Sequence, residues 1–318
     1  MGNEIRKDYL LERWSVIAAK RGKRPEDFVK KPEQDVKSSA DCFFCPGNEH
    51  TTPPEISRVE EGSRWLIRCF PNMFPATGFT RAKKRKGLLT SIPAYGRHEV
   101  IVETPDHEGL LHKLSLPHLT KLIDVYQCRT EALQALRGIR YVLVFKNFGR
   151  PAGASLYHTH SQIIGLPTVP ALILEEAEKS GGGRGCVLCR VLEEELASPR
   201  RVYEDKHVGA YTPYASRFPF EVWVQPKRHV RSLGELTDEE KESFVRAVKH
   251  VLGRLYGGLG GAPYNFYFHT SPPKKNLHLH LEICPKISNI AGFELGTGMF
   301  INVVPPEQAA EFYRRKNI

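Results

Sequence analysis

Hydrophobic and polar positions along the chain form a series of strand-like and helix-like segments that ends at a pair of histidines. Residues 98–103 alternate between polar and apolar side chains and predict a strand. Apolar residues on one helical face near 116–136 predict a helix, and the apolar run 141–145 predicts a further strand. A glycine-rich loop then leads to His158-Thr-His160. The first half therefore predicts strand, helix, strand and His-x-His in that order.

The same order of segments recurs in the second half. Residues 220–224 predict a strand, and residues 237–240 form a capping box that opens a helix. Residues 264–268 predict the next strand, which leads to His278-Leu-His280. We interpret the chain as a tandem duplication.

Each half combines several strands with one helix, which predicts an α+β fold of antiparallel sheets with flanking helices. The halves meet near residues 168–185, where Glu and Lys residues give way to a run of glycines. We therefore expect one domain over residues 1–170 and a second over residues 171–318.

The composition is that of a globular protein. Hydrophobic residues make up 41% of the 318-residue chain and charged residues 26%. No apolar run approaches the roughly 18 residues that a membrane span needs. The charged start of the chain leads into no apolar signal segment. We therefore expect a cytoplasmic protein with no membrane partner.

The formal net charge of +10 indicates a polyanionic partner. A nucleic acid and a small phosphorylated substrate both fit this charge. The densest basic run, residues 81–86, has no interleaved aromatic side chains on which bases could stack, and it is also typical of a solvated loop. We therefore expect a small-molecule substrate and no nucleic acid.

Seven cysteines, an odd number in a chain expected in the cytoplasm, argue against a disulfide framework. Four of them form two Cys-x-x-Cys pairs, one in each half, and each half also supplies two matching histidines. Two thiolates on one turn and two imidazoles make a tetrahedral zinc site. The first predicted site comprises Cys42, Cys45, His107 and His158. The second comprises Cys186, Cys189, His229 and His278.

Other interpretations of the cysteine pairs are open. A single zinc ribbon would join all four cysteines, but 141 residues separate Cys45 from Cys186, far more than the roughly 15–20 of known ribbons. A redox Cys-x-x-Cys would leave the matching histidines unexplained. His98 and His112 lie near His107 in the sequence and compete with it as ligands. The three remaining cysteines sit among apolar residues, and we expect them in the core.

The segment that ends at Gln162 carries the most chemical information. On an extended strand, the side chains of His158, His160 and Gln162 share one face. The neutral imidazole of His160 is a competent nucleophile toward phosphorus and needs no general base. Gln162 can hydrogen-bond a phosphoryl oxygen without adding negative charge, but it cannot protonate a leaving group. A sugar phosphate leaves as a stable anion, so these residues predict exchange between phosphates rather than hydrolysis.

Two further features bear on this strand. The loop Gly153–Ser155 can offer backbone N–H groups to phosphate oxygens. The equivalent strand of the second half carries Glu282 where the first carries Gln162, and a carboxylate there would repel a phosphate. We therefore expect catalysis in the first half and a structural role for the second. A structural core histidine is the alternative interpretation of His160.

Several motifs, spread almost from end to end of the chain, resemble one known family. The sequence His-x-His-x-Gln at 158–162 is similar to the signature of the transferase branch of the histidine triad superfamily, whose hydrolase branch has a third histidine. On these motifs the chain resembles the galactose-1-phosphate uridylyltransferase family. The other matching segments are residues 14–25, the zinc-binding start 42–55, the nucleoside-contacting segment 70–75 and the hexose-contacting segment 292–294.

This resemblance implies two histidine-triad-like units and a ping-pong reaction. His160 would attack the α-phosphate of UDP-glucose, release glucose 1-phosphate and pass UMP to galactose 1-phosphate. The resemblance also implies a homodimer whose hexose sites borrow residues across the interface, with zinc at the first metal site and zinc or iron at the second. The residues expected to bind nucleotide, phosphates and hexose are Arg21, Arg24, Asn72, Asn147, Gly153, Ala154, Ser155, Gln162, Phe293 and Glu294.

The chain departs from the family pattern at a few positions. The usual His-Pro-His has Thr159 at its centre here, and Leu156-Tyr157 replaces a common Asn-Pro. The second half, with its Cys-x-x-Cys and residues 292–298, is equally similar to ADP-glucose phosphorylases, which are adenylyltransferases that use phosphate as the acceptor. Uridylyl transfer and adenylyl transfer therefore both stay open. A zinc-stabilised nucleic-acid-binding protein is the third hypothesis.

Overall fold

The computed structural model describes residues 3–8, 12, 14–17, 38–79, 84–181 and 185–315, and these belong to two compact units. The first unit comprises Met1–Glu108, Cys128–Val144 and Tyr157–Glu176. The second comprises Gly109–Gln127, Phe145–Leu156 and Ala177–Ile318. The division of the sequence into residues 1–170 and 171–318 stays a prediction.

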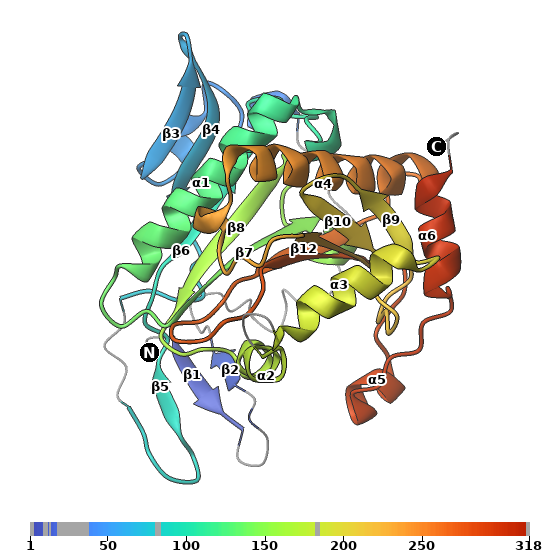
Figure 1. Ribbon diagram of the computed structural model, residues 1–318. Helices are drawn as coiled ribbons and strands as arrows, with labels where there is room; N and C mark the ends of the chain where they lie inside the picture. The colour runs from blue at the N-terminus through green and yellow to red at the C-terminus, as the bar shows by residue number, and fades with distance from the viewer. Residues whose placement is uncertain are drawn as a thin grey trace. The chain divides into compact units, whose positions relative to one another are not determined.

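The first unit contains two antiparallel sheets, whose strands are labelled in Figure 1. The strand order of the larger sheet is β3 (Ser57–Glu61), β4 (Arg64–Pro71), β6 (His98–Val102), β8 (His160–Leu166) and β7 (Tyr141–Phe148). The strand order of the smaller sheet is β2 (Trp14–Ile17), β1 (Glu4–Lys7) and β5 (Ser91–Pro93). Strand β6 is buried along its whole length and pairs with β4 on one edge and with β8 on the other.

The register between β6 and β8 sets the direction of the predicted catalytic side chains. Val102 pairs with His160, and Val100 pairs with Gln162. Side chains alternate between the two faces of a strand, so His160 and Gln162 lie on one face of β8 while Ser161 lies on the other. The shared face that the sequence predicts for His160 and Gln162 is therefore present.

The second unit repeats this arrangement with its own strands and helices. Its sheet begins at residues 145–148 of β7 and continues through β12 (Tyr264–His269), β13 (His280–Pro285), β11 (Val222–Pro226), β10 (Val208–Tyr211) and β9 (Arg201–Glu204). The long helix α4 (Asp238–Gly258), orange in Figure 1, packs against β9, β10 and β11. Helix α3 (Val187–Ala197) packs against β9 and β10, and α6 (Pro306–Arg314) packs against β9 and α4. The other helices are α1 (Leu116–Gln134), α2 (Ala171–Lys179), α5 (Gly292–Thr297), and the short 3-10 helices η3 (Ser39–Asp41), η4 (Glu49–Thr51), η5 (Leu111–Lys113), η6 (Arg150–Ala152) and η8 (Leu233–Glu235).

The topology confirms the predicted duplication. The order β3-β4-β6-β8-β7 in the first unit matches β9-β10-β11-β13-β12 in the second. In the sequence, α1 lies between β6 and β7, just as α4 lies between β11 and β12. Both units are antiparallel, which also confirms the α+β class with flanking helices.

One sequence signal for the start of a helix is present in the structure, and one predicted strand start is shifted. The capping box is present, because Glu240 N–H donates to the Thr237 hydroxyl at 3.3 Å and Thr237 N–H donates to the Glu240 carboxylate at 2.9 Å. The strand predicted at 220–224 begins instead at Val222, because Phe220 has a φ of +61°, which no extended strand tolerates. In the described part of the chain, no helix is long and apolar enough to cross a lipid bilayer.

Candidate active site and metal centres

The first predicted metal site is assembled within the first unit. Cys42 and Cys45 lie on one tight turn, which is closed by a hydrogen bond from Cys45 N–H to the Cys42 carbonyl oxygen at 3.3 Å. The amide of Asn48 donates to the carbonyl oxygens of Ala40 and Cys42, both at 2.9 Å, and holds this turn. Candidate ligand atoms of Cys42, Cys45, His107 and His158 all lie within 4.8 Å of one another.

The spacing of these atoms fits a tetrahedral ion. Cys45 Sγ lies 3.2 Å from His107 Nδ1 and 3.5 Å from His158 Nδ1, and Cys42 Sγ lies 3.6 Å from His158 Nδ1. Zinc bonds of about 2.3 Å to sulfur and about 2.1 Å to nitrogen would separate S from N by roughly 3.6 Å. The cluster therefore has the dimensions of a Cys2His2 zinc site.

The protonation of the ligands also suits a metal ion. His158 Nε2–H donates to the Thr104 carbonyl oxygen at 2.8 Å, which directs Nδ1 toward the two sulfurs. Burial lowers the pKa of His158, so its imidazole is neutral near pH 7. Burial, followed by the neighbouring Cys42, raises the pKa of the Cys45 thiol to about 12. A metal ion would replace that thiol proton.

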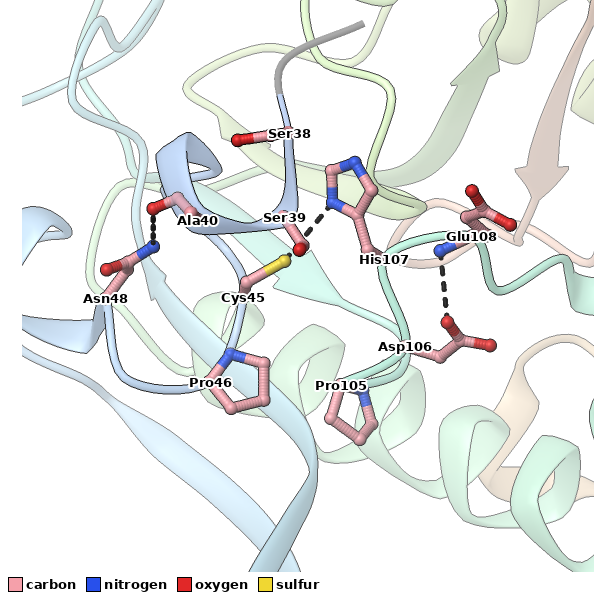
Figure 2. A pocket seen from close by; sticks show the side chains of 10 residues that line it. All are labelled: Ser38, Ser39, Ala40, Cys45, Pro46, Asn48, Pro105, Asp106, His107 and Glu108. Carbon is pink, nitrogen blue, oxygen red and sulfur yellow. Dashed lines mark hydrogen bonds between the residues drawn. The ribbon is translucent and has the colours of Figure 1, made fainter.

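A cavity of about 900 Å³ opens onto this cluster. Figure 2 shows Cys45 and His107 in its wall, with the sulfur facing Nδ1 of the imidazole, beside the carboxylates of Asp106 and Glu108. Among the described residues, neither His160 nor Gln162 lines it. The cavity therefore gives solvent access to the metal site rather than outlining the substrate site.

The second predicted metal site forms within the second unit. The ligand atoms of Cys186, Cys189, His229 and His278 also lie within 4.8 Å of one another. Cys189 Sγ lies 3.4 Å from His229 Nδ1 and 3.3 Å from His278 Nδ1. Burial, followed by the charge of His229, lowers the pKa of His278 to about 3 and keeps this ring neutral.

Hydrogen bonds from outside the second cluster orient its imidazoles. His229 Nε2–H donates to Asn276 Oδ1 at 3.0 Å, and His278 Nε2–H donates to the Arg228 carbonyl oxygen at 3.1 Å. The amide of Gln225 lies 2.8 Å from His278 Nδ1, so it would have to release that nitrogen when a metal binds. The sequence analysis did not find Gln225, because a glutamine within a strand carries no ligand signal.

Neither competing histidine joins the clusters of four ligands in the described part of the chain. His98 opens β6, and its Nε2 lies 2.8 Å from Gln162 Oε1. His112 belongs to the second unit, where its ring packs on that of Tyr256 with the centroids 4.7 Å apart. The preference for His107 over both of them therefore agrees with the geometry.

Strand β8 holds the ring of His160 in one direction. His160 Nδ1–H donates to the His158 carbonyl oxygen at 2.9 Å, so the neutral form of the ring carries its lone pair on Nε2. His160 is 6% exposed, and its ring packs edge to face with the ring of Phe44, with the centroids 5.4 Å apart. The predicted nucleoside-binding residue Asn72 reaches the same face, because its amide donates to Gln162 Oε1 at 3.4 Å.

The opposite face of β8 is held by a carboxylate that the sequence analysis missed. Thr159 Oγ1 donates to Glu103 Oε2 at 2.5 Å, and the hydroxyl of Ser161 donates to Glu103 Oε1. Glu103 is fully buried, and its backbone N–H donates to the Thr159 carbonyl oxygen at 3.3 Å. The departure from His-Pro-His at Thr159 therefore has a structural role, because the Thr159 hydroxyl binds Glu103 and so fixes the strand next to His160.

The second unit repeats the hydrogen bond between the two histidines but has no amide like that of Gln162 beside it. His280 Nδ1–H donates to the His278 carbonyl oxygen at 3.0 Å, as in the first unit. At the position of Gln162 stands Glu282, whose carboxylate accepts from Arg217. Burial alone would raise the pKa of Glu282, but the neighbouring His280 and His269, each with a ring nitrogen 3.6 Å from Oε1, and the charge of Arg217 hold the pKa far below its usual value. This buried, ionised carboxylate supports the interpretation that the second copy is structural.

The predicted phosphate loop lies in the second unit. Asn265 Nδ2 donates to Asn147 Oδ1 and to the Ala152 carbonyl oxygen, both at 2.8 Å. Gly153 has a φ of +90°, which only glycine adopts without strain. The loop that carries Ala154 and Ser155 is therefore preshaped.

The remaining predicted binding residues have separate outcomes. Phe293 lies on α5 with 46% of its surface exposed, and Glu294 caps that helix by accepting from Ala291 N–H at 3.0 Å. Arg21 and Arg24 lie outside the described residues.

Comparison with known proteins identifies the family. A profile described as galactose-1-phosphate uridyl transferase, N-terminal domain, matches residues 2–170, which is more than half of the chain. The chain belongs to this family. A second profile, a domain of unknown function (DUF4921), matches residues 118–313.

Relatives of this family member cover nearly all of its length. ADP-glucose phosphorylase of Arabidopsis thaliana is 31% identical, covering 99% of this chain and 93% of the relative. Galactose-1-phosphate uridylyltransferase of Thermotoga maritima is also 31% identical, covering 99% of each chain. The family member is therefore an enzyme, a nucleotidyltransferase.

Solved structures agree with this family assignment. The crystal structure of an ADP-glucose phosphorylase from Arabidopsis thaliana with bound ADP-glucose superposes with a TM-score of 0.76 at 30% identity, covering 100% of both chains. A uridylyltransferase structure superposes with a TM-score of 0.80 at 30% identity, covering 98% of this chain and 97% of the other. These likenesses confirm the predicted histidine-triad-like fold.

Removing the hydroxyls that bind Glu103 should destabilise the fold. In a Thr159→Val/Ser161→Ala double variant, the buried Glu103 carboxylate loses both hydroxyl donors. We expect the free energy of unfolding to fall by roughly 1–3 kcal/mol, the usual cost of removing hydrogen bonds to a buried charged group. Urea denaturation followed by circular dichroism measures this change. Thr159→Ser keeps the hydroxyl, so its free energy of unfolding should stay near that of the parent protein. Equal stability of all three proteins would contradict a stabilising role for the hydroxyl hydrogen bonds to Glu103.

Proposed function

We propose that this enzyme transfers a nucleoside monophosphate through a covalent intermediate on His160. The observation that carries the proposal is the hydrogen bond from His160 Nδ1–H to the His158 carbonyl oxygen, which leaves the ring lone pair on Nε2. A neutral imidazole with this tautomer attacks phosphorus without first losing a proton. Gln162 lies on the same strand face and supplies a neutral hydrogen-bond donor for a phosphoryl oxygen.

The proposed reaction has two similar displacements. His160 Nε2 forms a bond to the α-phosphorus of a nucleotide sugar while the P–O bond to the sugar phosphate breaks, and the sugar 1-phosphate leaves as an anion. An oxygen of the acceptor phosphate then forms a bond to the same phosphorus, the P–N bond breaks, and the electron pair returns to Nε2. Neither step requires a proton donor, which agrees with an amide rather than an acid at Gln162.

The specific activity that we propose is that of a galactose-1-phosphate uridylyltransferase, which transfers UMP from UDP-glucose to galactose 1-phosphate. The family profile over residues 2–170 and the Thermotoga maritima relative support this choice. The second candidate is adenylyl transfer from ADP-glucose to phosphate. The Arabidopsis thaliana ADP-glucose phosphorylase supports it with the same 31% identity.

We propose zinc at the first metal site, and zinc or iron at the second. When bound, such an ion would cross-link segments far apart in the chain and fix the ring of His158, whose carbonyl oxygen orients His160. Thiolate ligands persist in a reducing compartment, so we expect the enzyme in the cytoplasm, which cell fractionation would check.

We also propose a homodimer. Residues 287–303 expose a run of large apolar side chains, and Leu295, Ile301 and Val303 are 77%, 59% and 76% exposed. Monomers seldom leave so much contiguous apolar surface in water. A second copy of this chain is the occupant that the family predicts. No nucleic-acid partner is part of this proposal.

Intact mass spectrometry tests the covalent step. Incubated with UDP-glucose or ADP-glucose and no acceptor, the protein should gain the mass of one UMP or one AMP, and His160→Ala should gain neither. A uridylyl adduct that galactose 1-phosphate discharges would establish the first candidate, and an adenylyl adduct that phosphate discharges would establish the second. If neither donor labels the parent protein, the covalent mechanism is wrong.

Metal analysis tests the two clusters separately. The parent protein should hold one metal ion per cluster, and Cys45→Ser and Cys189→Ser should each lose one of them. Inductively coupled plasma mass spectrometry measures both the amount and the element. Cys128→Ser is the matched control, because Cys128 lies outside both clusters and is exposed, whereas only Cys69 and Cys284 have the core positions expected from the sequence. Full metal content in both cluster variants would contradict the assignment of Cys45 and Cys189 as metal ligands.

Analytical ultracentrifugation tests the dimer. The parent chain of 36.0 kDa should sediment as a species of twice that mass. A Leu295→Glu/Ile301→Glu variant should sediment as a monomer, because charges on this surface cannot be buried unpaired. Leu88→Glu removes an equally exposed leucine from the first unit and should stay dimeric. A monomeric parent protein would refute the proposal.

A further inference from the structure

His98 has no part in either metal cluster, yet its ring is almost completely buried beside the proposed catalytic strand. It is 5% exposed at the start of β6, and its Nε2 lies 2.8 Å from Gln162 Oε1. Its carbonyl oxygen accepts from Asn72 N–H at 2.8 Å. His98 therefore joins the nucleoside-contacting segment to the residue that we propose for phosphate binding.

Backbone groups decide which atoms of His98 donate and which accept. Ala76 N–H lies 3.2 Å from His98 Nδ1, and a backbone N–H can only donate. The lone pair of the ring is therefore on Nδ1, so the neutral ring carries its proton on Nε2. An Nε2–H donor requires an acceptor, which assigns the facing atom of Gln162 as its carbonyl oxygen.

A second backbone N–H group independently gives the same orientation of the Gln162 amide. Phe74 N–H donates to Asn72 Oδ1 at 2.8 Å, so the other end of the Asn72 amide is its NH2. That NH2 donates to Gln162 Oε1 at 3.4 Å. Two side chains, each oriented by the backbone, therefore converge on Oε1. The NH2 group of Gln162 is left as the end that faces away from them.

This polarity has a chemical consequence, because the two ends of an amide are nearly equal in size. With Oε1 toward a phosphate, Gln162 would repel the phosphoryl oxygens, whereas with NH2 toward it, Gln162 would stabilise their charge. Sterics alone do not choose between these orientations. The donors on His98 and Asn72 do.

We infer that His98 is a positioning residue, which with Asn72 locks the amide of Gln162 so that its NH2 faces the transferred phosphoryl group. The phosphoryl part of this inference rests on the proposed function. The locked orientation itself does not depend on the reaction.

A double-mutant cycle tests the coupling between His98 and Gln162. His98→Leu removes the donor, and we expect single-turnover formation of the His160 adduct to slow by roughly 10- to 100-fold. His98→Gln keeps a donor and an acceptor on a neutral side chain, and it should recover most of that rate. In a Gln162→Leu background, His98→Leu should cause no further loss, because there is no amide left to orient. Equal slowing in both backgrounds would overturn the inference and assign His98 a merely structural role.

Histidine NMR separates this inference from the proposed function. Long-range ¹H–¹⁵N correlation should show the His98 ring as the neutral Nε2–H tautomer, and the signal should vanish in His98→Gln, which assigns it. An Nδ1–H tautomer would overturn the inference whether or not the protein forms an adduct. A protein that shows the Nε2–H tautomer but no adduct would keep the locked amide and lose the proposed function.

Discussion

His160 donates its Nδ1–H to the carbonyl oxygen of His158, two residues earlier on the same strand, and the chemistry of the site follows from that bond. The bond fixes the tautomer, so the lone pair on Nε2 is ready without a general base. It also makes His160 depend on the position of His158, which the Thr104 carbonyl oxygen and the two cysteine sulfurs hold in turn. A metal ion bound by this cluster would therefore support the proposed reaction without taking part in it, by holding the residue that orients His160.

The two copies of the unit differ in the groups beside the second histidine of each His-x-His. The second unit has the same strand order and the same bond, from His280 Nδ1–H to the His278 carbonyl oxygen. It differs where Glu282 replaces Gln162, and there Arg217 neutralises the buried carboxylate. The ring of Trp223 also stacks on His280 with centroids 4.9 Å apart, which covers the imidazole face. The proposed reaction therefore needs a neutral donor beside the histidine as well as the histidine itself.

Much of this could be predicted from the sequence, because periodicity and spacing are local signals. The strand and helix order, the capping box at Thr237 and the grouping of each cysteine pair with its histidines all follow from such signals. The partners of the catalytic strand could not be predicted. Glu103 lies more than fifty residues from Thr159, and His98 lies as far from Gln162. The two residues of each pair come together only when β6 pairs with β8. A residue type alone does not predict a hydrogen-bond partner so far away in the sequence. The late start of β11 at Val222 likewise reflects a turn at Phe220 rather than its propensity.

The proposed transfer between two phosphate anions would constrain the groups around it. A carboxylic acid would favour one protonation state in the first displacement and the opposite one in the second, whereas an amide presents the same donor to both. A neutral imidazole likewise returns to its starting form when the P–N bond breaks. Such neutral groups lack the charge that usually orients a side chain, so their direction has to come from hydrogen bonds. Backbone N–H groups at Ala76 and Phe74 and the carbonyl oxygen of His158 supply that direction here. The main chain therefore decides which atoms of these side chains donate hydrogen bonds and which accept them.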